Sequence, residues 1–196
     1  MAIHIFSEEY LSRACMGIID LLRPLPPGQN KAVISALANL DALLESALAC
    51  AWDRCIRATD GGGIRPTVRF YRRSGAIAEL ILPSLDEEDL SQIRLAANVA
   101  GILLEAEVDG YFVISEAWVA KSSADPEVAK LRPRQRSDRQ EVLFVSAGLA
   151  GRHTLRLYPM IRGADAKLTG FGDAETLSGN LHPMMLNLYA IADGLA

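Results

Sequence analysis

The sequence is poor in the features that direct a protein into or across a membrane. No apolar run approaches the roughly 20 residues that are needed to span a bilayer. Residues 1–13 lack a basic stretch followed by an apolar one, so they do not have the pattern of a signal peptide. We therefore expect a cytoplasmic protein that makes no contact with a membrane.

Cysteine is scarce as well, with 3 in a chain of 196 residues. An odd number of thiols without a signal peptide fits a reduced protein of the cytosol. Cys50 and Cys55 lie five residues apart, which is not a spacing typical of metal ligands, and the 3 histidines are scattered. The sequence therefore predicts neither a metal nor another cofactor.

An excess of positive charge is also missing. The formal net charge is −4, which argues against a dedicated nucleic-acid binder. The charge is unevenly spread, however, because one short stretch carries five basic residues and a single acidic one. These are Lys130, Arg132, Arg134, Arg136 and Arg139, against Asp138.

Hydrophobic residues make up 50% of the chain, enough for a sizeable core. Apolar residues at helical spacing and good helix starts predict helices over residues 7–22, 29–58, 83–108 and 182–196. β-Prone runs predict strands over 67–73, 76–83 and 110–121, and a hairpin over 141–162 that turns near residues 148–151. The glycine-rich stretch 164–180 is predicted to be a loop, with room for one short strand.

This order of elements predicts a single α+β domain over residues 1–196. Residues 1–60 would form an antiparallel helical hairpin, because the prolines of "RPLPPG" end the first helix. Residues 64–196 would form a mostly antiparallel sheet of about five strands. We expect the helical hairpin, the central helix and the C-terminal helix to pack against that sheet.

Residues 122–140 form an unusual connection between two predicted strands. Loops longer than about 12–15 residues are uncommon inside a compact domain. The simpler interpretation is a solvated connection, since the stretch has two prolines and no aromatic residue. The sharper one is a basic arm that binds phosphate, nucleic acid or an acidic partner. Its binding residues would be Lys130, Arg132, Arg134 and Arg136.

Glu116 is the odd residue of the strand predicted over 110–121. Alternation places Phe112, Ile114, Glu116 and Trp118 on one face of this strand. The other face is apolar too, so the strand should be covered on both sides. A carboxylate that is at least half-buried there must be paired, hydrogen-bonded or protonated.

The motif "SEAW", a polar loop with proline, and then "DRQEVLFV" resemble a group of uncharacterised bacterial and phage proteins. These proteins share a Glu-Ala-Trp strand, a proline-bearing loop and an Asp-Arg-x-Glu motif where the next strand begins. The matching residues here are Glu116, Ala117, Trp118, Asp138, Arg139 and Glu141. The resemblance covers about residues 109–162 and implies a shared core, with no assigned activity.

Three interpretations of Glu116 stay open at this point. In the first, Glu116 forms a structural ion pair with Arg139 or Arg156 from neighbouring strands. In the second, it belongs to a catalytic cluster, described below. In the third, it lines a ligand pocket beside Trp118 and Tyr111.

The catalytic interpretation brings Asp109, Glu116 and Glu141 together around a metal-activated water. Helix, three strands and helix is also the element order of the restriction-endonuclease-like core, which would make the protein a metal-dependent nuclease or a phosphate-handling enzyme. Such sites usually carry an acidic residue, any residue and then lysine on the second catalytic strand. Glu141 is followed instead by Val142 and Leu143, and an order of elements does not establish a function.

The leading prediction is a non-enzymatic module of phage or mobile-element type that dimerises or binds a protein partner. It depends on the wide apolar stripe of the helix predicted over 29–58 and on the lack of a complete catalytic motif. The metal-dependent enzyme is the first alternative. Nucleic-acid binding through the basic stretch 130–139 is the second.

Overall fold

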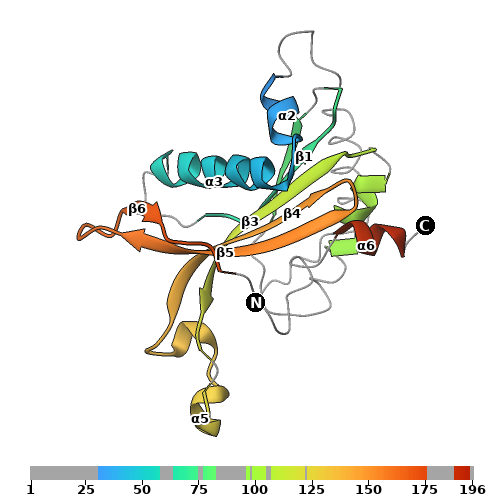
Figure 1. Ribbon diagram of the computed structural model, residues 1–196. Helices are drawn as coiled ribbons and strands as arrows, with labels where there is room; N and C mark the ends of the chain where they lie inside the picture. Colours follow the sequence, from blue (N-terminus) through green and yellow to red (C-terminus); the bar gives the residue numbers. More distant parts are fainter. Residues whose placement is uncertain are drawn as a thin grey trace, which may run out of the picture.

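The computed structural model describes residues 31–57, 64–74, 77–82, 96–97, 99–104, 107–121, 123–175 and 188–194. They form an α+β fold in which a six-stranded antiparallel sheet carries helices on both faces (Figure 1). The strand order is β2-β1-β3-β4-β5-β6. The helix predicted over 7–22, and with it the first half of the helical hairpin, lies outside the described residues.

The strands are β1 (Thr67–Tyr71), β2 (Ile77–Ile81), β3 (Gly110–Val119), β4 (Gln140–Leu149), β5 (Arg152–Arg162) and β6 (Leu168–Phe171). The helices are α2 (Lys31–Ala36), α3 (Leu40–Arg57), α5 (Pro126–Ala129), α6 (Leu188–Asp193) and the short 3-10 helix η1 (Pro133–Gln135). Residues 96–97 and 99–104 are helical as well. The sheet has one strand more than expected, because β6 forms in the stretch 164–180 and pairs with β5.

The helix predicted over residues 29–58 is two helices in the structure. α2 ends at Ala36 and α3 begins at Leu40. Asn39 lies between them, and its Oδ1 accepts a hydrogen bond from the backbone N–H of Ala42 at 2.8 Å, as a residue that caps a helix N-terminus does. Apolar residues continue at helical spacing across this break, so periodicity alone did not reveal it.

Each face of the sheet has its own apolar core. α2 and α3 cover one face, where they pack on alternate residues of β3, β4 and β5. The helical residues 96–97 and 99–104 and α6 cover the other face. Tyr111, Phe112, Val113 and Ile114 are all buried, which confirms that β3 is covered on both sides. α2 and α3 therefore share an apolar core with the sheet.

The two hairpins of the central sheet are closed in different ways. A two-residue turn, Ala150 and Gly151, joins β4 to β5. Both residues have positive φ, 49° and 77°, as the tight turn between antiparallel strands requires. β3 and β4 pair from Gly110 to Val119 without a tight turn, because residues 120–139 lie between them.

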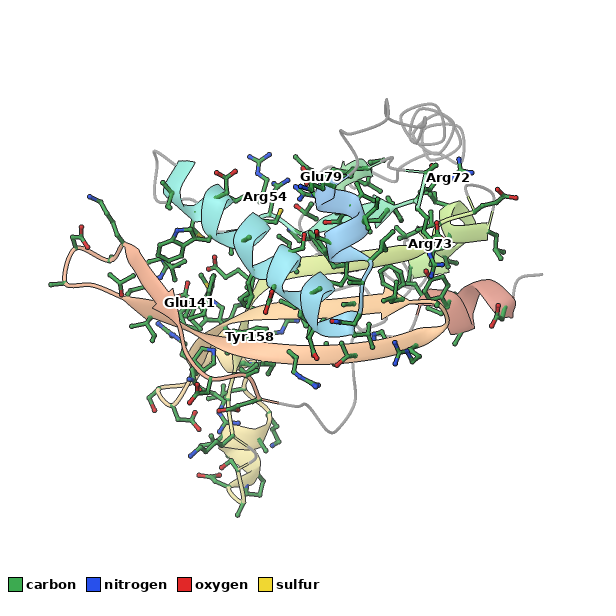
Figure 2. The ribbon with its side chains drawn as sticks, turned by 45° about the horizontal axis from the view of Figure 1, so that its top comes forward. Arg54, Arg72, Arg73, Glu79, Glu141 and Tyr158 are labelled. Carbon is green, nitrogen blue, oxygen red and sulfur yellow. The ribbon has the colours of Figure 1, made fainter. Side chains whose placement is uncertain are left out.

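Residues 120–139, which we call the arm, project from the body of the molecule. Both figures show the arm extending away from the sheet and from α3, with α5 towards its tip (Figures 1 and 2). Asp125 Oδ1 caps α5 by accepting a hydrogen bond from the backbone N–H of Glu127 at 2.9 Å. Among the arm's described residues only Arg136 is buried. The arm therefore contributes almost nothing to either core.

Candidate functional site

Two carboxylates lie together on the face of the sheet that α3 covers. Strand alternation points Glu116 of β3 to this face beside Ile114, and Glu141 of β4 beside Leu143. In the strand register Glu116 is opposite Leu143, and Trp118 is opposite Glu141. The two glutamates are therefore diagonal neighbours, at a separation that long side chains can bridge.

Arg162 at the end of β5 binds this pair. Its Nε and Nη2 donate to the two carboxylate oxygens of Glu141 at 2.6 and 2.5 Å, a bidentate contact of the strong, charge-assisted kind. The same Nη2 lies 3.9 Å from Glu116 Oε2. That oxygen also accepts a hydrogen bond from the backbone N–H of Ile64 at 3.1 Å. We call Glu116, Glu141 and Arg162 the glutamate–arginine cluster.

One positive charge does not neutralise two carboxylates, and the environment divides them. Burial and the neighbouring Glu141 raise the pKa of Glu116 above its ordinary value of 4.5. The hydrogen bonds from Arg162 lower the pKa of Glu141 below that value. Glu116 therefore retains a proton more readily, and Glu141 carries the negative charge that Arg162 neutralises.

α3 covers the cluster with Cys55. This thiol is half-buried and lies within electrostatic range of Arg162, Glu116 and Glu141. Burial is the largest influence on it and raises its pKa. Cys55 is therefore held as the neutral thiol, which is a poor nucleophile and a poor metal ligand.

The three acids predicted to form a catalytic cluster do not meet. Asp109 lies just before β3, at the opposite end of that strand from Glu116, roughly 20 Å away at the usual rise per residue. Its carboxylate accepts a hydrogen bond from the backbone N–H of Arg73 at 2.7 Å. Among the described residues no three His, Cys, Asp or Glu side chains are grouped so that they could hold a metal ion.

The arginine that faces Glu116 is also not one of those predicted. Arg139 lies over the ring of Trp118, 5.0 Å from its centroid, and donates to the carbonyl of Arg134 at 2.7 Å. Arg156 lies opposite Val145, two residues along the strand from the level of Glu116. Its side chain donates to the carbonyl of Leu155. Arg162 takes the predicted role, because its long side chain reaches back along the face from the end of β5.

The basic residues of the arm are partly engaged with acids of the arm itself. Lys130 Nζ lies 2.5 Å from Glu127. Arg136 donates two hydrogen bonds to Asp138, at 2.9 and 2.8 Å. The predicted group of four basic residues is therefore not uniform, and its exposed arginines are Arg132 and Arg134. Their side chains make interactions too.

A serine–histidine pair lies on the other face of the sheet, where the sequence had suggested nothing. Ser146 Oγ and His153 Nε2 are 2.9 Å apart. Burial lowers the pKa of His153, so its imidazole is held neutral. Ser146 has no exposed surface, and a substrate could not reach its hydroxyl. We assign the pair to packing.

Sequence reasoning missed Arg162, Ile64 and Cys55. Alternation on β5 would have placed Arg162 on the correct face, but only the register of the β4–β5 hairpin shows that it meets Glu141. Ile64 contributes a backbone N–H and Cys55 comes from a helix above the sheet. Neither has a signal in the sequence.

None of the described helices is both long and apolar enough to cross a membrane. No model of a protein family matches the chain, and no curated protein is significantly similar to it.

Proposed function

We propose that the protein is a non-enzymatic binding module, of the phage or mobile-element type that its resemblance implies, and that it holds a protein partner through the arm. The observation that carries this proposal is the arm itself. It is about twenty residues long, and its described residues bury one side chain, Arg136, and extend away from the core. Loops of this length are uncommon in a compact domain, and many of those that occur are functional.

The glutamate–arginine cluster supports a structural rather than a catalytic role. Glu141 is held by two hydrogen bonds from Arg162, and Glu116 is held by Ile64. The first contact ties β5 to β4, and the second ties the residues just before β1 to β3. A hydrolytic metal site would need a further ligand, and Asp109 lies at the other end of β3.

The surface of the arm suits a protein with acidic groups around an apolar centre. Leu131 is 43% exposed and lies beside Arg132, with Arg134 two residues further on. Lys130 and Arg136 of the arm are paired with Glu127 and Asp138. These two carboxylates would repel a phosphate backbone. Trp118 at the base of the arm is already stacked by Arg139, so that face of its ring is not open to a nucleotide base.

The test is to remove the arm and keep the sheet. Val119 pairs with Gln140 in the β3–β4 register, so residues 120–139 can be replaced by Asn-Gly, which forms a two-residue hairpin turn. We expect this variant to fold, with its thermal midpoint shifted by about 5 °C or less. We expect the full chain to be retained on immobilised poly-L-glutamate at low salt, and the armless variant to lose this retention.

The matched control removes two positive charges from the body instead of the arm. Arg65 and Arg152 are both exposed. The double variant Arg65→Ala, Arg152→Ala should still be retained on poly-L-glutamate. The double variant Arg132→Ala, Arg134→Ala should not be retained. Equal retention of the armless and full chains would overturn the proposal. Tighter retention on DNA than on polyglutamate at the same salt would favour the nucleic-acid alternative. Heat released on titration with Mg²⁺ or Mn²⁺ would favour the enzyme.

A further inference from the structure

We infer that the protein held by the arm is a second copy of this chain, and that the arm of each copy docks on the outer face of α3 in the other. This rests on the proposed function, since it names the partner of the same arm. It adds the surface that receives the arm, which is the exposed side of α3.

Charge is segregated between the arm and the rest of the chain. Residues 121–139 contain 6 basic and 3 acidic residues, which leaves 14 basic and 21 acidic residues elsewhere. The arm is thus positive by three charges, whereas the remainder is negative by seven. Two copies can bring these opposite charges together, and complementary potentials of this kind favour association and fix its orientation.

The outer face of α3 carries acidic residues that could complement the positive charge of the arm. The exposed acids of the helix are Asp41, Glu45 and Asp53. Arg54 is turned away from that face, because it pairs with Glu79 on β2 (Figure 2). The only other basic residue of α3 is Arg57, its last residue.

α3 also offers an apolar counterpart for the arm. Trp52 is 36% exposed and Ile56 is 65% exposed. The ring of Trp52 is supported from one side by an edge contact with Phe171, with centroids 6.2 Å apart. Leu131 is the exposed large apolar residue of the arm, so burying it against Trp52 would place apolar groups at the centre and charges at the rim, as in many protein interfaces.

The positions of the two surfaces exclude a contact between them within one copy. In both views α3 covers the sheet while the arm extends away from it (Figures 1 and 2), so the arm does not lie on the α3 of its own chain. A twofold arrangement would use each surface once per copy and make the contact twice. Such an assembly is a closed dimer in which both surfaces of each copy are occupied.

Charge reversal on each surface tests the pairing. Variant A carries Arg132→Glu and Arg134→Glu on the arm, and variant B carries Glu45→Lys and Ala49→Lys on the exposed side of α3. By sedimentation equilibrium we expect the full chain to dimerise, and A and B alone to dimerise more weakly by at least about tenfold in Kd. A mixture of A and B should dimerise again, because both contacts of the mixed dimer are then complementary.

The outcomes separate this inference from the proposed function. If A loses self-association but B retains it and the mixture does not recover, α3 is not the receiving surface. If the full chain stays monomeric at high concentration while its arm still retains it on polyglutamate, the second copy is the wrong partner and the proposed function stands. Loss of both behaviours would overturn both. Thermal melting of A and B checks that each variant is folded.

Fluorescence gives a readout at the receiving surface itself. The chain has 2 tryptophans, so Trp118→Phe leaves Trp52 as the only indole. We expect its emission to shift to shorter wavelength as concentration rises through the dimer Kd, and not to shift in variant A. A shift that survives removal of the arm would overturn the inference.

Discussion

The two ends of β3 carry the same chemical groups and use them differently. At the start of the strand, Asp109 accepts a hydrogen bond from the backbone of Arg73, and the Arg73 side chain, 3.6 Å away, is 70% exposed. At the far end, Glu116, Glu141 and Arg162 are only 21%, 14% and 32% exposed. One end is a solvated turn contact, and the other is a half-buried network that joins three strands.

The difference shows why a carboxylate in a strand does not by itself indicate chemistry. Water can replace a lost partner at the exposed end, whereas the half-buried end has no such substitute. The same loss of one partner should therefore have very different consequences at the two ends. Four measurements can break or sharpen this comparison.

The largest effect is expected for Arg162→Met. This change leaves Glu141 half-buried without its cation, and removal of one partner from a buried pair is strongly destabilising. We expect the free energy of unfolding to fall by about 2–3 kcal/mol, below the full penalty because the cluster is not fully buried. Urea unfolding followed by circular dichroism measures it. A loss similar to that of Arg73→Ala would show that the network is not coupled.

The next largest effect is expected for Glu116→Ala. The backbone N–H of Ile64 would lose its acceptor, so we expect a loss of about 1–2 kcal/mol. Glu116→Gln is the matched control, since an amide oxygen can still accept from Ile64 and its NH2 can donate to Glu141. It should remain within about 0.5 kcal/mol of the original chain. If Gln were as damaging as Ala, the hydrogen bond that Glu116 accepts from Ile64 would not be the reason for its position.

The dependence of stability on pH tests the raised pKa of Glu116 independently. The pKa of Glu116 is raised in the folded protein, so its contribution to stability is complete below the ordinary value of 4.5 and is lost as the pH rises through the folded pKa. Glu116→Gln removes this loss. Its stability relative to the original chain should therefore increase from acid towards neutral pH, measured by urea unfolding at several pH values. Parallel profiles would contradict the assignment.

The smallest effects are expected at the other end of β3. Asp109→Ala removes one acceptor from an exposed backbone N–H and should cost about 0.5–1 kcal/mol. Arg73→Ala removes only a solvated charge contact and should change stability by less than about 0.5 kcal/mol. Thermal melting at low and high salt can compare the two. A large, salt-sensitive effect of Arg73→Ala would erase the contrast between the ends.

The sequence allowed the order of most described elements to be predicted, because alternation and turn residues are local signals. The β1–β2 hairpin, β3 and α6 lie within predicted stretches, and the β4–β5 hairpin begins one residue before its predicted start. The break at Asn39 was missed, and the stretch that contains β6 was predicted as a loop with room for one short strand. In both places a capping or pairing contact overrides the local pattern.

The candidate site was predictable only in part. Alternation identified the face of Glu116, and the need for a compensating group followed from burial. The identity of that group depends on the register between strands. If the position of the turn is uncertain by a few residues, the register cannot be predicted. Asp109 was grouped with Glu116 and Glu141 as a carboxylate cluster, but Asp109 precedes β3 and Glu116 lies seven residues further along the chain, inside that extended strand.

The two ways of closing the central hairpins also imply an order of assembly. Bringing β4 and β5 together closes a loop of two residues, whereas β3 can meet β4 only when the twenty residues of the arm are closed. The longer loop costs about 2 kcal/mol more in chain entropy. β4 and β5 are therefore expected to form first and to act as the template on which β3 is added. In this order of folding the arm is closed last, so its length can change without altering how the sheet is nucleated.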